Sequence, residues 1–117
     1  MSLPPRLPKK AKRSSRWRSQ AHLNFIRSFH CAVPECQGMP IEAAHVRNGS
    51  GAGMGEKPSD HFAVPLCRDH HAQQHTIGEV TFWKNYATAS GQTVDRLIDE
   101  LRRASPKARE IREAING

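Results

Sequence analysis

The chain has 117 residues, a formal net charge of +7, and only 37% hydrophobic and 6% aromatic residues. This length fits one domain with a small core, and a core of that kind often needs a staple such as a metal ion. No apolar run approaches the roughly 20 residues that span a bilayer, and the basic N-terminus lacks the apolar segment of a secretory signal. We therefore expect a cytoplasmic protein with no membrane partner.

The positive charge is concentrated at the N-terminus. Residues 1–34 contain eight Arg or Lys and no acidic residue, whereas the rest of the chain holds ten basic and eleven acidic residues. Three prolines among the first eight residues oppose a helix there. Residues 1–18 are thus predicted to be a flexible, disordered basic arm. It would be either a solubilising tail or, as we favour, a DNA-binding arm that contacts phosphates without sequence preference, through Lys9, Lys10, Lys12, Arg13, Arg16 and Arg18.

The remaining sequence predicts an α+β domain whose elements alternate with loops rich in glycine and proline. In chain order these elements are a short helix or turn at 20–29, a tight loop at 30–40, a strand at 41–47, a glycine-rich loop at 48–59, a strand at 62–66, a segment of potential metal ligands at 67–75, a helix at 79–89, a helix capped by Thr93 and a last helix from Pro106 to Ile115. The proline in the second strand restricts it to a sheet edge or a strand end.

Potential zinc ligands occur in two short pairs. Cys31 and Cys36 are separated by four residues, and Cys67 and His70 by two. Both spacings are typical of a structural zinc ion, which takes four sulfur or nitrogen ligands in a tetrahedron. Three cysteines in a chain without an export signal also argue against a disulfide framework. Buried free cysteines remain the alternative, and His71 competes with His70 for the fourth position.

Two further histidines lie four residues apart. On a helix His71 and His75 would share one face and could chelate a second cation, although an ordinary solvated face would show the same spacing. His45, on the predicted first strand, is then free of zinc. A neutral imidazole beside a bound cation can take a proton from water.

This order of residues resembles the HNH family of nucleases, which have a ββα-metal fold that is often braced by a zinc knuckle. The matching frame consists of Cys31 and Cys36, then His45, then the group Cys67, His70, His71 and His75. More narrowly, the segments AHVR at 44–47, GAGMGEKPSD at 51–60, VPLC at 64–67 and HH at 70–71 look like small prophage-encoded Ref-like HNH proteins. The resemblance covers roughly residues 20–85. It implies an HNH domain with a zinc knuckle at 19–89 and a helical extension at 90–117.

The resemblance implies metal-dependent hydrolysis of DNA. His45 would activate water, Asp60 would orient His45 or the hairpin, and a divalent cation (Mg²⁺, Mn²⁺ or Zn²⁺) on His71 and His75 would contact the scissile phosphate. Arg47 and Lys57 are candidates for holding the flanking DNA backbone. At least one Ref-like protein works beside a recombinase filament, which makes such a filament a possible partner in prophage recombination.

Two positions depart from the family pattern. The metal ligand that usually precedes the base histidine is replaced by Ala44, and the central asparagine of the HNH motif is replaced by Phe62. A non-catalytic, zinc-stapled nucleic-acid-binding module or a recombinase-recruitment module is therefore the alternative function.

Overall fold

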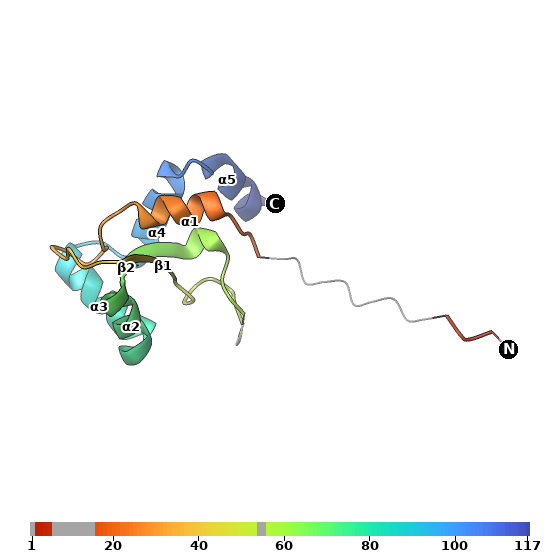
Figure 1. Ribbon diagram of the computed structural model, residues 1–117, viewed down its shortest axis with the longest axis horizontal. Helices are drawn as coiled ribbons and strands as arrows, with labels where there is room; N and C mark the ends of the chain where they lie inside the picture. The colour runs from red at the N-terminus through yellow and green to blue at the C-terminus, as the bar shows by residue number, and fades with distance from the viewer. Residues whose placement is uncertain (1, 6–15, 54–55) are drawn as a thin grey trace.

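The structure, a computed structural model, describes residues 2–5, 16–53 and 56–117 (Figure 1). The arm residues Lys9, Lys10, Lys12 and Arg13 lie outside the described residues. The fold is α+β, as predicted, and its elements are α1 (Gln20–Arg27), β1 (Ile41–His45), the short 3₁₀ helix η1 (Asp60–Phe62), β2 (Ala63–Cys67), α2 (Arg68–Ile77), α3 (Glu79–Ser90), α4 (Val94–Ala104) and α5 (Ala108–Asn116).

The centre of the fold is an antiparallel hairpin. In it β1 pairs with β2 so that Ile41 lies opposite Cys67 and His45 lies opposite Ala63. The predicted first strand extended to residue 47, but regular pairing ends at His45. The second strand begins and ends one residue later than predicted, and all of its residues are buried.

The second strand leads directly into α2. Cys67 is its last residue and also the N-cap of the helix, because its sulfur accepts a hydrogen bond from the backbone N–H of His70. A capping side chain satisfies one of the otherwise unpaired N–H groups at a helix start. The hairpin therefore passes into α2 with no intervening loop, because Cys67 both ends β2 and caps the helix.

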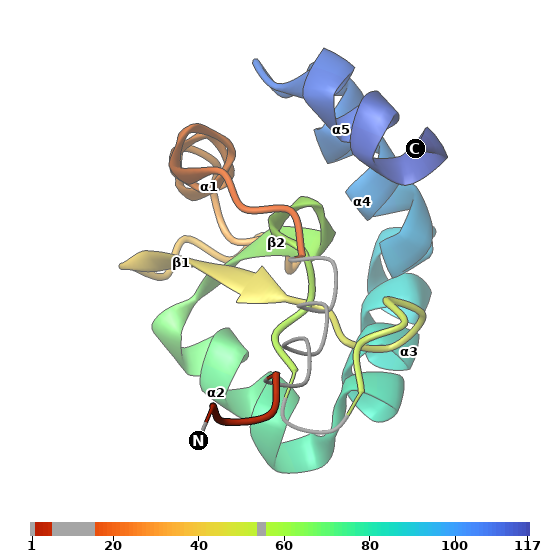
Figure 2. The same ribbon diagram turned by 90° about the vertical axis from the view of Figure 1, so that its right-hand side faces the viewer.

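The helices cover the hairpin from two sides (Figures 1 and 2). Helices α1, α4 and α5 lie on one side of it, and α2 and α3 lie on the other. The apolar faces of α1, α3 and α4 meet the hairpin in one core whose buried members include Ile26, Val46, Leu66, Trp83 and Ile98. Ser19 caps α1 and Thr93 caps α4, the latter as the sequence predicts. No helix in the described part of the chain has the length and apolar character of a membrane span.

Buried histidines connect the C-terminal helices to the rest of the domain. The Nδ1 atom of His22 lies 2.7 Å from the Ser105 hydroxyl, and Arg102 donates to the carbonyl oxygen of His61 at 2.9 Å. Burial lowers the pKa of both histidines, with Arg102 adding to the effect, and the pKa of His61 falls to about 4. Both imidazoles are therefore neutral at physiological pH and pack as core residues.

Candidate functional site

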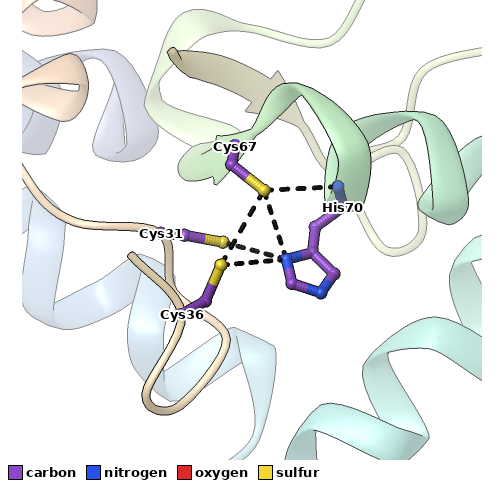
Figure 3. Close-up of side chains that lie close together, drawn as sticks. All are labelled: Cys31, Cys36, Cys67 and His70. Carbon is purple, nitrogen blue, oxygen red and sulfur yellow. Dashed lines mark hydrogen bonds between the residues drawn. The ribbon is translucent and has the colours of Figure 1, made fainter. Parts of the chain in front are cut away.

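The three cysteines and His70 converge on one point (Figure 3). Cys31 and Cys36 come from the loop that follows α1, Cys67 from the end of β2 and His70 from the first turn of α2. The Nδ1 atom of His70 lies 3.4 Å from the sulfurs of Cys31 and Cys36 and 3.3 Å from that of Cys67. All four ligand atoms lie within 4.8 Å of one another. Of the two adjacent histidines, His70 is the one that joins the thiols.

These distances lie within a few tenths of an ångström of those expected for a tetrahedral zinc site. Zinc with bonds of about 2.3 Å to sulfur and about 2.1 Å to nitrogen sets its ligand atoms roughly 3.5 to 3.8 Å apart. The separation of the Cys36 and Cys67 sulfurs is 3.9 Å, and the three thiols form no disulfide. Burial raises the pKa of the Cys31 thiol to about 11, so a cation is needed to hold it as a thiolate at neutral pH. The group could hold a structural zinc ion.

The cysteine loop depends on a glycine that the spacing argument did not single out. A side chain at Gly38 would place its Cβ 3.0 Å from the Cys67 sulfur and 3.1 Å from the Cys67 Cβ. Contacts this short are rare for a Cβ atom, and Cys67 cannot move away without leaving the cluster, so glycine is the residue that fits here. The backbone N–H of Gly38 also lies 3.4 Å from the Cys36 sulfur. A glycine two residues after a ligand cysteine is the sequence signal that could have identified this position.

His45 is held by a buried carboxylate. Its Nε2 atom lies 2.9 Å from Oδ1 of Asp60, whose side chain is 3% exposed. The other carboxylate oxygen accepts the backbone N–H of Ser19 at 2.8 Å, and Arg18 lies 3.3 Å from Oδ1. Because an ionised carboxylate only accepts hydrogen bonds, the proton of His45 is on Nε2 and Nδ1 carries a free lone pair.

The surroundings of His45 and Asp60 determine the charge of each side chain at neutral pH. Burial lowers the pKa of His45 below its ordinary value, although contact with Asp60 opposes the shift. Burial alone would raise the pKa of Asp60, but hydrogen bonds from His45 and from the Ser19 N–H outweigh it, and the net pKa is below the usual value. At neutral pH the pair is a neutral imidazole beside an ionised carboxylate.

One open cleft of about 300 Å³ collects most of the remaining predicted site residues. It lies between β1, the loop that precedes η1, and α2. Its lining includes all of the histidines and cations that the sequence assigned to chemistry or DNA contact outside the cysteine cluster and the arm: His45, Arg47, Lys57, His71 and His75. Residues up to thirty positions apart in sequence thus line one concave surface.

The two histidines of α2 lie side by side in this cleft, with ring centroids 5.1 Å apart. The Nδ1 atom of His71 lies 2.9 Å from Oε1 of Glu42, a residue of β1. Among the described residues, the cysteine cluster is the only group of three or more ligands. A cation here would therefore have two imidazole ligands and would need phosphate or water oxygens to complete its coordination.

The predicted DNA-binding residues differ in their surroundings. Arg16 pairs with Glu56 at 2.9 Å, and Arg18 contacts the carbonyl oxygens of Lys57 and Pro58, so both bind the protein's own loop. Arg47 donates to the carbonyl oxygen of Gly53 at 2.6 Å. Lys57 is exposed, and none of the described residues forms a hydrogen bond or ion pair with its side chain. Lys57 is the cation of the cleft most available to a phosphate.

The two positions that depart from the HNH pattern belong to the packing of the domain. Ala44 is fully buried in the core. Phe62 is half-buried, and the guanidinium carbon of Arg102 lies 4.6 Å from its ring centroid. Asp60 lies two residues before Phe62 and supplies the polar contact to His45.

Comparison with known proteins gives a family match over most of the chain. The sequence model of a family described as "Protein of unknown function (DUF968)" matches residues 4–104, which include both the cysteine cluster and the cleft. The chain is similar to the "Uncharacterized protein YdfU" of Escherichia coli strain K12, with 36% identity over 95 residues. The aligned region is 80% of this chain and 25% of that protein, so the chain spans about a quarter of the relative's length. No solved structure matches the chain significantly.

Proposed function

The chain belongs to the DUF968 family, and we propose that it is a metal-dependent endonuclease of the HNH type that hydrolyses DNA phosphodiester bonds. The observation that carries the proposal is the cleft in which His45, braced by Asp60, faces the same space as His71, His75 and Lys57. A base, two imidazole ligands and a cation for the phosphate are the parts that such a hydrolysis needs.

The zinc knuckle is proposed to hold these parts in place. Cys67 and His70 connect β2 to the first turn of α2, and His71 follows directly in the chain. A zinc ion on Cys31, Cys36, Cys67 and His70 would therefore fix the helix that carries His71 and His75 relative to the hairpin that carries His45. Zinc has no catalytic role in this arrangement because all four of its positions are taken by protein.

In this proposal each residue of the cleft has a separate role in hydrolysis. His45 takes a proton from the attacking water on its Nδ1 atom, while Asp60 keeps the other ring proton on Nε2 and holds the ring orientation. Lys57 contacts the DNA backbone beside the reacting phosphate. His71 and His75 would hold a divalent cation, which when bound stabilises the charge on the phosphate and on the leaving oxygen.

Cleavage of supercoiled plasmid by the zinc-loaded protein tests this function directly. We expect nicking that requires added Mg²⁺, Mn²⁺ or Zn²⁺ and that stops when a chelator removes the added cation, because two imidazoles alone cannot neutralise the developing charge. Single-stranded and recombinase-coated DNA are tested in parallel, since the resemblance to Ref-like proteins extends the proposal to recombination. Failure to cleave any of the three DNA forms, with every cation tried, would reject the nuclease.

A non-catalytic nucleic-acid-binding or recombinase-recruitment module is the second candidate. It is favoured by Ala44 and Phe62, since the two positions where an HNH nuclease has a metal ligand and an asparagine are filled here by packed apolar side chains. This module would keep the zinc knuckle and the basic arm, and His71 and His75 would have no cation to bind. DNA binding without cleavage is the result that would select it.

Both candidate functions predict that the basic arm supplies electrostatic affinity. Deleting residues 2–15 removes five Lys or Arg residues and leaves the internal contacts of Arg16 and Arg18 in place. Binding to duplex DNA should become less salt-dependent, with the logarithmic slope falling by about 0.9 for each phosphate that the arm no longer neutralises. Fluorescence anisotropy at several salt concentrations measures the slope. A variant with the five basic residues replaced by glutamine is the matched control for chain length. An unchanged slope in both variants would contradict a DNA-binding arm.

A further inference from the structure

Glu42 is a residue of β1 whose carboxylate reaches across to α2. Its Oε1 atom lies 2.9 Å from Nδ1 of His71, and its Oε2 atom lies 3.9 Å from the guanidinium of Arg68, one helical turn earlier. Both carboxylate oxygens therefore face side chains of α2. The contact joins the strand of the base histidine to the helix of the candidate cation ligands.

The contact selects one nitrogen of His71. An ionised carboxylate accepts hydrogen bonds and donates none, so the Nδ1 atom of His71 carries the proton and its Nε2 atom has the free lone pair. In metal sites, a carboxylate that accepts the second ring N–H of a histidine fixes the tautomer and orientation of that ligand and raises its basicity. Nε2 is then the atom of His71 that is free to bind a cation.

Two carboxylates thus contact two histidines of one cleft, but each engages a different ring nitrogen. Asp60 accepts from Nε2 of His45 and leaves Nδ1 free, whereas Glu42 accepts from Nδ1 of His71 and leaves Nε2 free. Glu42 and His45 are three residues apart in β1. The same strand therefore carries the base and supports the neighbouring ligand.

We propose that Glu42 is the positioning residue for the cation ligand His71, an inference that rests on the proposed cation site of the nuclease. Glu42 itself is not a ligand in this assignment, because its Oε1 atom lies at hydrogen-bond distance from Nδ1 of His71 and its side chain does not line the cleft. Its effect is exerted through the orientation and basicity of the imidazole, and so it bears on cation affinity before it bears on cleavage.

The test measures Mn²⁺ binding to the zinc-loaded protein by calorimetry, since Mn²⁺ does not compete for a cysteine-rich site. Glu42→Ala should weaken Mn²⁺ binding about 10- to 100-fold, and Glu42→Gln, whose amide oxygen can still accept from Nδ1, should weaken it less. Glu100→Gln removes one charge from an exposed ion pair of α4 and is the matched control, with unchanged affinity. Zinc content, equal in all four proteins, shows that the fold is retained.

Nitrogen NMR of the His71 ring separates this inference from the proposed function. The wild type without added cation should show the proton on Nδ1, and Glu42→Ala should shift it to Nε2. A proton on Nε2 in the wild type, or Mn²⁺ affinity unchanged in Glu42→Ala, would overturn the role of Glu42. Absence of Mn²⁺ binding by the wild type would overturn both that role and the cation site. Mn²⁺ binding that depends on Glu42, without DNA cleavage, would leave Glu42 as proposed and reject the nuclease alone.

Discussion

Replacing His45 with alanine is expected to lower the rate of DNA cleavage by roughly 10²- to 10⁴-fold, the usual contribution of a general base. The side chain lies at the end of β1, half-buried, and has no role in the zinc cluster or the core. The variant should therefore keep its zinc content, its fold and its DNA affinity, although the loss of a hydrogen-bond partner of the buried Asp60 should lower its melting temperature. Single-turnover cleavage of a labelled duplex, at saturating cation, measures the reduction in rate.

The base and the cation ligands can be told apart in the same assay. His71→Ala and His75→Ala should also lose cleavage, but part of the loss comes from weaker cation binding, so excess cation should restore some of it. Excess cation should not restore His45→Ala. Full cleavage by His45→Ala would rule out the HNH mechanism.

The same base predicts how the cleavage rate depends on pH. Because the pKa of His45 is lowered by burial, its imidazole is already neutral at neutral pH. The wild-type rate should fall only as the medium becomes acidic enough to protonate His45.

Loss of the zinc site is expected to unfold the domain. Structural zinc contributes about 10–16 kcal/mol in zinc-finger peptides, which is comparable to the whole unfolding free energy of about 5–15 kcal/mol for a typical domain. Cys67→Ser removes a zinc ligand but leaves a hydroxyl that can still cap α2. We expect this variant to lack zinc and to show no cooperative thermal transition by circular dichroism.

The two adjacent histidines provide a matched control for this result. His70→Ala removes a ligand of the cluster, whereas His71→Ala changes the same residue type one position along the same helix. His70→Ala should behave like Cys67→Ser, and His71→Ala should retain zinc and melt like the wild type. Equal melting temperatures for the wild type before and after complete zinc removal would show that the metal does not hold the fold together.

The ligand cluster could be predicted from the sequence because the short spacing within each pair of ligands already brings the two members of that pair close together. Cys31 and Cys36 lie in one loop, Cys67 and His70 lie within one turn of each other, and a chain that places each pair locally has only to bring two pairs together. The choice of His70 over His71 followed from the same local argument. The capping role of Thr93 was equally local, and it too is present.

Contacts between distant segments were harder to predict. Glu42 reads as one polar residue in a short strand, and its pairing with His71 depends on how α2 crosses the hairpin. Arg16 and Arg18 looked like parts of a uniform basic arm, because composition cannot show that their guanidinium groups reach carbonyls and a carboxylate about forty residues later. The strand ends also shifted by one or two residues, since pairing rather than residue preference ends a hairpin.

The segment around Arg18 and Ser19 has a consequence for the order in which the protein becomes organised. Its contacts with Lys57 and Asp60 join residues 39 to 42 positions apart, and loops of that length close late compared with local turns. At a synthesis rate of about 5–20 residues per second, this segment is made roughly 2–8 s before its partners. Asp60 cannot hold His45 in a fully supported geometry until the two meet. On the proposed function, a nascent chain would carry His45 beside an Asp60 that still lacks part of its support, and competence to cut DNA would arrive only after residues 18–19 and 57–60 have met.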